Sequence, residues 1–181
     1  MLCLVTVAAL LQPGYATRAD DNDDRRVRMG ARLFRFLIAA DLALDHKVGA
    51  DGKLHVQVYA RDKHLADDVA ELIAPKTEDG AKIQGLDLVV ESSSALPSAD
   101  RPLAGVFLAQ PPDDKALEQL IGWGIHEHVV VYSPFEGHVE RGVLGGFTLE
   151  AKVRPYVNMK TLAASGIELK PLFLKIAKVH E

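Results

Sequence analysis

Histidines on either side of a short apolar strand are the residues best suited to chemistry in this chain. His126 and His128 precede the strand, and His138 and Glu140 lie in the loop that follows it. If the strand extends back to residue 126, the first two side chains point to one face of the sheet, and His138 or Glu140 would complete a zinc-like ligand set. The alternative is that these imidazoles are partly solvated hydrogen-bonding residues. We favour that alternative and expect no bound metal.

Motifs that would indicate catalysis are missing from the sequence. It contains no GxxxxGKS/T, GxSxG, HExxH or CxxC pattern. Gly142, Gly145 and Gly146 form a glycine-rich patch, but this patch does not follow a parallel strand and open a helix as a phosphate-binding loop does. We expect these glycines to pack tightly in a hairpin, and we interpret Trp123 as a packed aromatic rather than a ligand-stacking residue. The sequence therefore predicts no catalytic residue, no enzyme activity and no cofactor.

Residues 133–142, with the sequence SPFEGHVERG, form the loop after the apolar strand. Open α/β sheets usually bind their partners at the carboxyl ends of their strands, and functional residues concentrate on such loops. Two interpretations stay open at this point. The loop is either a binding surface or a connector in which Glu140 and Arg141 are merely solvated.

The elements that must position this loop follow an alternating pattern. In chain order we expect a helix over 25–44, a strand over 54–59, a helix over 61–74, strands over 86–90 and 104–109, a helix over 113–121 and a strand over 128–132. Continuous apolar strands that alternate with helices are typical of a parallel sheet covered on both faces.

The last third of the chain has a different pattern. Strands over 143–150 and 152–157 are separated by a very short turn, which predicts an antiparallel hairpin. Asn158 is a natural N-cap for a helix that Gly166 ends, and a final helix is expected over 171–179. The predicted fold class is therefore α/β, with a Rossmann-like, mainly parallel sheet, flanking helices, and a C-terminal antiparallel hairpin plus helices.

The first sixteen residues predict export. Residues 1–16 carry no charge, and their apolar run is shorter than the roughly 20 residues that a bilayer requires. Gly14-Tyr15-Ala16 resembles a signal-peptide cleavage site. No Lys or Arg precedes the run, so a buried strand or helix is the alternative. Cys3, the sole cysteine, would leave with the signal peptide, and the mature protein would be periplasmic.

Composition indicates the domain organisation and the charge of the remaining residues. We expect a flexible acidic leader over residues 17–24 and a single domain over 25–181. The 181 residues are 48% hydrophobic, which allows a substantial core without disulfides or metals. With 21 Lys and Arg against 25 Asp and Glu, the net charge of −4 offers no basic surface for nucleic acid. No stretch after residue 16 is long and apolar enough to span a membrane.

Several short motifs follow one another between the loop and the C-terminus. They are a serine followed by Glu136-Gly137, then Glu140-Arg141-Gly142, Phe147-x-Leu149-Glu150, Val153-Arg154 with Val157-Asn158, and Ala163-x-x-Gly166-Ile167-x-Leu169 with Leu172, Leu174 and Ala177. In residue types and spacing this part of the chain resembles the YfiR family of small periplasmic regulatory proteins. Looser agreement extends over residues 25–179.

This resemblance implies a protein that acts without catalysis. The best-known family members bind the periplasmic part of an inner-membrane diguanylate cyclase and hold it inactive, which limits cyclic di-GMP and biofilm formation. On this basis we expect a partner-binding surface at Glu136, Gly137, Glu140, Arg141 and Gly142. Phe147, Asn158 and Gly166 are expected to be structural.

Two departures from the family pattern indicate a divergent member. The mature chain lacks the cysteine pairs that often form disulfides in the family, and Gly146 replaces a common asparagine. A periplasmic small-ligand receptor, with the 133–142 loop as its mouth, therefore stays open as an alternative, as does a homodimer. A small metal-dependent enzyme built on His126, His128 and Glu140 is the less favoured alternative.

Overall fold

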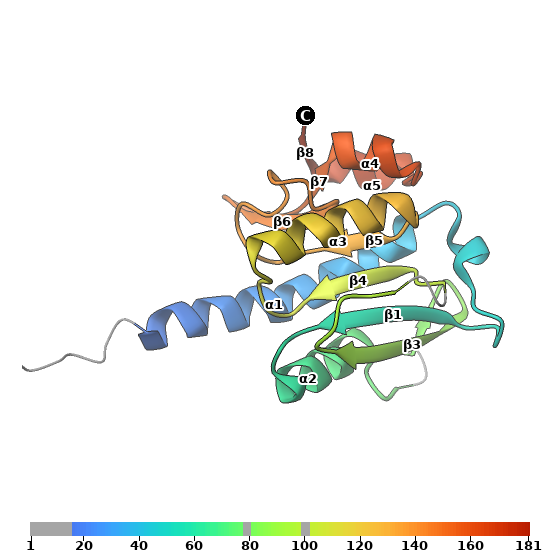
Figure 1. Ribbon diagram of the computed structural model, residues 1–181. Coiled ribbons are helices and arrows are strands. Elements are labelled where there is room, and N and C mark those ends of the chain that lie inside the picture. Colours follow the sequence, from blue (N-terminus) through green and yellow to red (C-terminus); the bar gives the residue numbers. More distant parts are fainter. Residues whose placement is uncertain (1–15, 78–80, 99–101) are drawn as a thin grey trace, which may run out of the picture.

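The computed structural model describes residues 16–77, 81–98 and 102–181. The expected signal peptide lies outside the described residues except for Ala16. The elements in chain order (Figure 1) are α1 (Ala16–Ala40), the 3-10 helix η1 (Leu44–Lys47), β1 (Leu54–Tyr59), α2 (Lys63–Ile73), β2 (Lys82–Ile83), β3 (Leu86–Ser93), β4 (Gly105–Leu108), α3 (Asp114–His126), β5 (Val130–Tyr132), β6 (Gly145–Leu149), β7 (Val153–Asn158), α4 (Met159–Ser165), α5 (Pro171–Ile176) and β8 (Lys178–His180).

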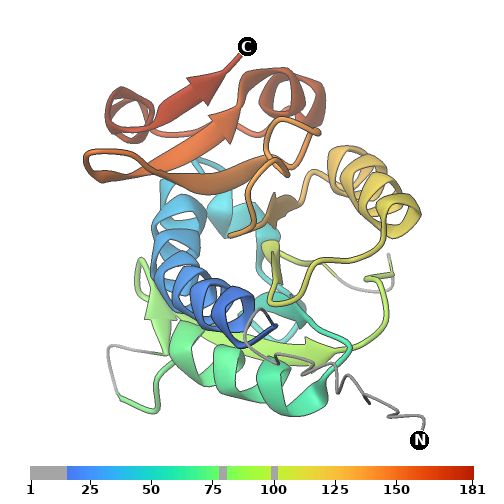
Figure 2. The same cartoon turned by 90° about the vertical axis from the view of Figure 1, so that its left-hand side faces the viewer.

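All the strands join one eight-stranded sheet in the order β2-β3-β1-β4-β5-β6-β7-β8. The five central strands, β3, β1, β4, β5 and β6, are parallel, whereas β6 and β7 form an antiparallel hairpin. Helices α1 and α2 cover one face of the sheet and α3 covers the other (Figure 2). This arrangement confirms the predicted fold class.

Helix α1 forms the core of the first face because its apolar stripe lies directly on the strands. Leu37 and Ile38 are fully buried. A Cβ atom added at Gly145 would lie 2.3 Å from Leu37 Cδ2, and one added at Gly105 would lie 2.6 Å from Ile38 Cδ1. The helix therefore approaches the sheet more closely than any side chain at these two positions would allow.

The second face has its own smaller core. Leu117 and Leu120 of α3 pack with Val106 and Val131 of the central strands. Neighbouring strand residues such as Phe107 point to the opposite core, beneath α1. This alternation is what period-two geometry requires of strands that are covered on both sides.

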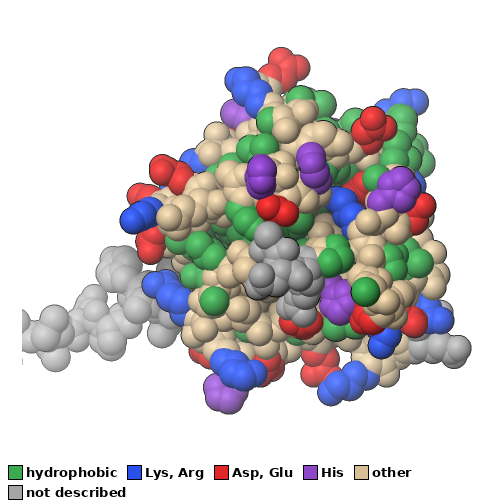
Figure 3. Space-filling view, turned by 45° about the vertical axis from the view of Figure 1, so that its right-hand side comes forward, with side chains coloured by type: hydrophobic (Ala, Val, Ile, Leu, Met, Phe, Trp, Pro, Cys, Tyr) green, Lys and Arg blue, Asp and Glu red, His purple; other side chains and the backbone are tan. Residues whose placement is uncertain are grey.

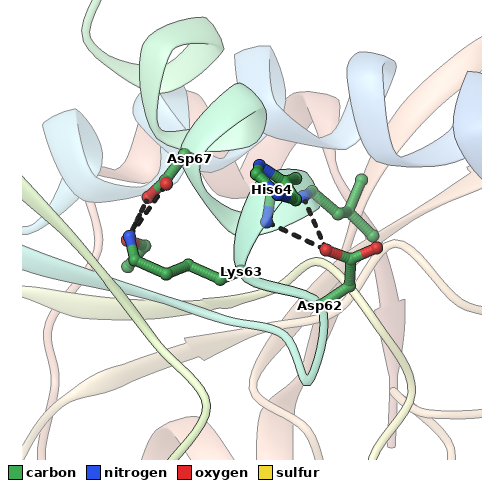
Figure 4. Close-up of polar contacts among 6 residues, drawn as sticks. Asp62, Lys63, His64 and Asp67 are labelled. Atoms are coloured by element: carbon green, nitrogen blue, oxygen red, sulfur yellow. Dashed lines mark hydrogen bonds and ion pairs between the residues drawn. The ribbon is translucent and has the colours of Figure 1, made fainter.

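Local capping explains where α2 begins. The Asp62 carboxylate accepts hydrogen bonds from the backbone N–H groups of His64 and Leu65, at 2.9 and 3.4 Å, which makes it the N-cap. Lys63 Nζ lies 2.9 Å from an oxygen of Asp67 one turn later (Figure 4). The helix consequently starts at Lys63 rather than at the predicted Arg61.

Helix α1 differs from the prediction at both ends. It begins at Ala16 instead of Arg25, so the acidic segment 17–24, predicted to be a flexible leader, continues the helix. No Pro or Gly interrupts the chain between Ala16 and Met29, and Figure 1 shows this part extending beyond the sheet. The helix ends at Ala40 because the buried Asp41 side chain accepts from the Ala43 N–H at 2.9 Å. Within the described residues, no helix is long and apolar enough to cross a bilayer.

The end of the chain also differs from the prediction. The final helix stops at Ile176, and Val179 belongs to β8, where it pairs with Val157 in parallel register. The Arg154 guanidinium donates hydrogen bonds to the carbonyl oxygens of Ile176 and Ala177, both at 3.2 Å. These bonds satisfy carbonyl groups at the helix terminus, and the chain then turns into the sheet.

Candidate functional site

The loop between β5 and β6 is held in one conformation by its own backbone. Hydrogen bonds run from the N–H groups of Arg141, Gly142 and Val143 to the carbonyls of residues 137, 139 and 138, at 3.1, 3.1 and 3.0 Å. Gly137 and Gly142 have φ values of +78° and +112°, which only glycine adopts without strain. These two glycines of the predicted site are therefore required for the shape of the loop.

Buried polar side chains fix the loop from below. Ser133 Oγ and His138 Nδ1 share a hydrogen bond at 2.8 Å, and Ser133 Oγ accepts from the Phe135 N–H at 3.2 Å. Burial, together with the nearby Arg141 charge, lowers the pKa of His138. Ser133 has no exposed surface, so this serine–histidine pair is inaccessible to a substrate.

Asn158 joins the loop to the C-terminal helices. Its Oδ1 accepts from the Thr161 N–H at 2.9 Å, and its Nδ2 donates to the Val139 carbonyl at 2.7 Å. The predicted N-cap is thereby confirmed, and it has a second role in supporting the loop. Gly166 ends α4 in the left-handed conformation, with φ +65°, as the sequence predicted.

Arg26, on α1, is the residue that the sequence analysis missed. Its side chain is 4% exposed, its Nε donates to the Pro134 carbonyl at 2.7 Å, and its Nη1 donates to Glu136 Oε1 at 2.8 Å. The guanidinium carbon also lies 4.7 Å from the centre of the Phe147 ring, a favourable cation–π distance. The sequence did offer one signal for this residue. Arg26 lies one turn before Gly30, on the side of the helix that is buried, where a charged side chain is unusual.

A hollow of about 300 Å³ opens beside this arginine at the carboxyl edge of the sheet. We call it the carboxyl-edge hollow; it is lined by Arg26, Phe135, Glu136, Gly137, Val139, Glu140, Phe147, Thr148, Leu149, Tyr156 and Lys178. The predicted residues Glu136, Gly137 and Glu140 thus come together here, with Phe147 as a wall. Glu136 is exposed over 81% of its side chain although its carboxylate is held by a buried cation.

The lining of the hollow includes a second cation, Lys178. Lys178 Nζ lies 2.7 Å from Glu150 Oε1 and 5.2 Å from the centre of the Tyr156 ring. The hydrogen bond from Lys178 lowers the pKa of Glu150 and raises that of Lys178. Burial, together with the Glu140 carboxylate, raises the pKa of Tyr156. The hollow therefore presents paired charges above aromatic rings.

Arg141 and Gly142 do not line the hollow. Arg141 Nη2 forms a 2.8 Å ion pair with Asp114 in the first turn of α3, and the Gly142 carbonyl accepts from Thr161 Oγ1 at 2.8 Å. The structure thus divides the predicted surface. One part forms the rim of the hollow, and the other ties the loop to α3 and α4.

The geometry on which the metal alternative depended is absent. His126 is the last residue of α3 and not part of a strand. Helix α3 continues past Gly124, which packs so closely on β5 that a Cβ would lie 2.5 Å from Val131 Cγ2. His128 Nδ1 instead meets the Ser165 carbonyl at 2.6 Å, and His138 is buried in the loop. Figure 3 shows histidine side chains scattered over one face. In the described ranges, no three His, Cys, Asp or Glu residues form a metal-binding group.

Comparisons with known proteins support the fold and no more than the fold. No protein-family model matches the chain, and no curated protein matches it. Among solved structures, the ABC domain in complex with L-Trp from Streptococcus pneumoniae has a TM-score of 0.50 at 10% identity, over 86% of this chain and 60% of that one. A conserved domain protein from Vibrio cholerae has a TM-score of 0.44 at 14% identity, over 75% and 57% of the two chains. This chain therefore spans less than two thirds of either protein.

Proposed function

We propose that this protein is a non-catalytic periplasmic regulator of the YfiR type, and that its carboxyl-edge hollow binds the sensor domain of a membrane signalling enzyme such as a diguanylate cyclase. The observation that carries this proposal is the Arg26–Glu136 pair. A buried guanidinium holds an exposed carboxylate at a fixed position on the surface. A contact residue that is already ordered loses little conformational entropy when a partner binds.

The surroundings of Glu136 have the composition of an interface. Leu149 and Val153 pair across the β6–β7 hairpin and are 47% and 43% exposed. Glu140 and Lys178 add charges of both signs beside them. An apolar centre with a polar rim is typical of protein–protein interfaces.

A binding role fits the chemistry of this edge better than a catalytic role. The serine and histidine that stand at hydrogen-bond distance are both buried and serve the loop. The exposed carboxylates, Glu136 and Glu140, belong to a surface that also holds the neighbouring cations. Nothing in this arrangement positions a general base next to an accessible nucleophile.

The experiment is a binding titration with the purified periplasmic sensor domain of a membrane diguanylate cyclase from the same organism. Charge reversal by Glu136→Lys should weaken binding about thirtyfold, corresponding to roughly 2 kcal/mol at the centre of an interface. Glu118→Lys, an equivalent change at an exposed position of α3, should leave binding unchanged. Equal affinity of both variants and the wild type would place the interface elsewhere.

A small-ligand receptor is the second candidate function, because the hollow has the volume of a small site and the loop forms its mouth. The Streptococcus pneumoniae domain of similar fold was solved with L-Trp bound. A calorimetric titration of this protein with L-Trp, repeated on Thr148→Trp to fill the hollow, tests the candidate. Heat of binding that disappears in the variant would favour the receptor.

A further inference from the structure

A groove of about 410 Å³ lies where the C-terminal half of α1 meets the hairpin of β2 and β3. We call it the α1–β2 groove; it is lined by Arg32, Arg35, Phe36, Ala39, Lys82, Ile83 and Gln84. None of these residues lines the carboxyl-edge hollow, so the groove is a separate surface from that of the proposed function.

Side-chain hydrogen bonds hold the two walls of the groove together. The Gln84 amide Nε2 donates to the Ala39 carbonyl at 2.7 Å, and Arg35 Nη2 donates to the Lys82 carbonyl at 2.9 Å. Arg35 also donates to the Ile73 carbonyl at the end of α2. The hairpin is thus fixed against the helix, and a partner meets a groove that is already formed.

The charges that line the groove share one sign. Arg32, Arg35 and Lys82 contribute cations, and no Asp or Glu of the described segments belongs to the lining. Lys82 Nζ lies 3.8 Å from Asp87 Oδ1, and its side chain is 47% exposed. Phe36 also lines the groove and is 64% exposed, whereas phenylalanine is usually buried. The surface is therefore complementary to an anionic partner that also carries an apolar group.

The positive surface continues along α1 beyond the groove. Arg25, Arg28 and Arg32, which we call the arginine stripe, are exposed. Their spacings of three and four residues, with Phe36 four residues later, place them on one face of the helix. Within the described ranges, none of the three arginine side chains forms an ion pair or a hydrogen bond. About 16 Å separate Arg25 from Phe36 along the helix axis, the length of roughly five residues of an extended peptide. A stripe of this length suits a chain segment better than a small ion.

We propose that the arginine stripe and the α1–β2 groove together bind an acidic segment of a partner protein, in which Asp or Glu residues surround one large apolar side chain. The carboxylates pair with the exposed guanidinium groups, whose planar donors match two carboxylate oxygens. The apolar side chain enters the groove and packs on Phe36, which fixes the position of the segment along the stripe.

An anionic membrane surface is a less suitable occupant. A helix that lies in a membrane interface needs a broad apolar face, and Phe36 is the only exposed large apolar residue among the described side chains of α1. A groove also receives a side chain from its partner, whereas membrane binding requires the protein to project its own.

The probe is a fluorescein-labelled peptide of sequence EEDFDEE, titrated with the purified protein at low salt while fluorescence anisotropy is recorded. Saturable binding is expected, and the matched peptide EEDADEE should bind about tenfold more weakly, because alanine leaves the groove unfilled. Added salt should weaken the binding of both peptides, since exposed charges are screened. Absence of saturable binding, or binding to phosphatidylglycerol vesicles but not to the peptide, would overturn the proposal.

Charge reversal tests the arginine stripe. Arg32→Glu should weaken peptide binding about tenfold, because it places a carboxylate against the acidic segment. Lys115→Glu makes the same change in net charge at an exposed position of α3, on the other face of the sheet, and should change binding by less than about twofold. Equal losses in the two variants would show that only the net charge matters and would refute the site.

Phe36→Ala tests the groove at an exposed position. In this variant EEDFDEE and EEDADEE should bind with equal affinity, because the apolar contact is lost from the protein side. A preference for the phenylalanine peptide that persists would refute docking in the groove. Sedimentation of the protein alone tests the remaining occupant, since a concentration-dependent dimer that Arg32→Glu dissociates would place a second copy on the stripe and overturn the proposal.

Discussion

The Arg26 guanidinium donates to the Glu136 carboxylate at 2.8 Å across a sequence separation of 110 residues. One partner is almost completely buried and the other is almost completely exposed. The same guanidinium also donates to the Pro134 carbonyl. Arg26 therefore supports the backbone of the loop, and Glu136 is the part of this contact that a partner can reach.

Arg26 and Glu136 should consequently contribute unequally to stability. Arg26→Met leaves the Pro134 carbonyl without its donor and should cost about 2 kcal/mol of unfolding free energy. Glu136→Gln retains an acceptor at an exposed position and should change it by less than about 1 kcal/mol. Urea unfolding of both variants measures the difference. Equal losses would mean that the ion pair, and not the carbonyl contact, holds the loop.

The close approach of α1 to the sheet predicts the effect of adding a methyl group. Gly145→Ala places a Cβ 2.3 Å from Leu37 Cδ2 and should destabilise the fold by about 1–3 kcal/mol through overpacking. Gly122→Ala is the matched control, because a Cβ there meets nothing within 4 Å on α3, and it should stabilise by about 0.5–1 kcal/mol. Thermal unfolding should show opposite shifts of the midpoint, and shifts of the same sign would refute this packing.

The two hydrogen bonds of Asn158 can be separated by mutation. Asn158→Ala removes both the helix cap and the donor to Val139, and should cost about 1–2 kcal/mol. Asn158→Asp keeps the capping oxygen but loses the donor. Hydrogen exchange should therefore quicken at the Gly142 and Val143 amides in both variants, and at Thr161 only in Asn158→Ala. Protection of the loop amides in Asn158→Asp would contradict the supporting role.

His138 predicts a pH dependence of stability. Burial lowers its pKa in the folded protein below the ordinary value of 6.5, so the unfolded chain binds a proton in a pH range where the folded chain does not. Stability should therefore fall as the pH is lowered from about 7.5 through 6.5 and below. Urea unfolding at several pH values should show a shallower dependence for His138→Gln. An unchanged dependence would assign the effect to other groups.

Export can be checked by mass. If residues 1–16 are a signal peptide, protein recovered by osmotic shock should begin at Thr17 and lack Cys3. Intact-mass measurement of that fraction reports the cleavage site directly. A product that stays in the cytoplasm and retains Cys3 would refute the periplasmic assignment and require a different class of partner.

Features governed by local chemistry were predicted well from the sequence. The alternating residues of β1 gave its bounds correctly, and the hairpin, the Asn158 cap and the Gly166 helix end were confirmed. In each case the deciding residues are neighbours along the chain. The glycine-rich patch was also interpreted correctly, because Gly145 and Gly146 both lack space for a side chain.

Features that depend on distant contacts were not predictable in the same way. The strand that contains Val179 forms only because β7 offers it a pairing edge. The spacing of Leu172, Phe173, Ile176 and Val179 was therefore misread as one helix. Arg26 was overlooked because its partners lie more than a hundred residues away. The extension of α1 to Ala16 shows that a charged segment stays helical when it continues a well-anchored helix.

Helix α1 is held at both ends by later parts of the chain. Gly30, near Arg26, abuts the loop so closely that a Cβ would lie 2.8 Å from Pro134 Cβ, and at the other end of the helix the Ala40 carbonyl accepts from the Lys170 N–H at 2.8 Å. About 15 residues separate Arg26 from Asp41, which corresponds to roughly 22 Å along the helix axis. One continuous helix therefore joins the loop to the C-terminal segment. A substitution that shifts α1 along its axis would therefore displace the anchor of Glu136 together with the contact at Lys170.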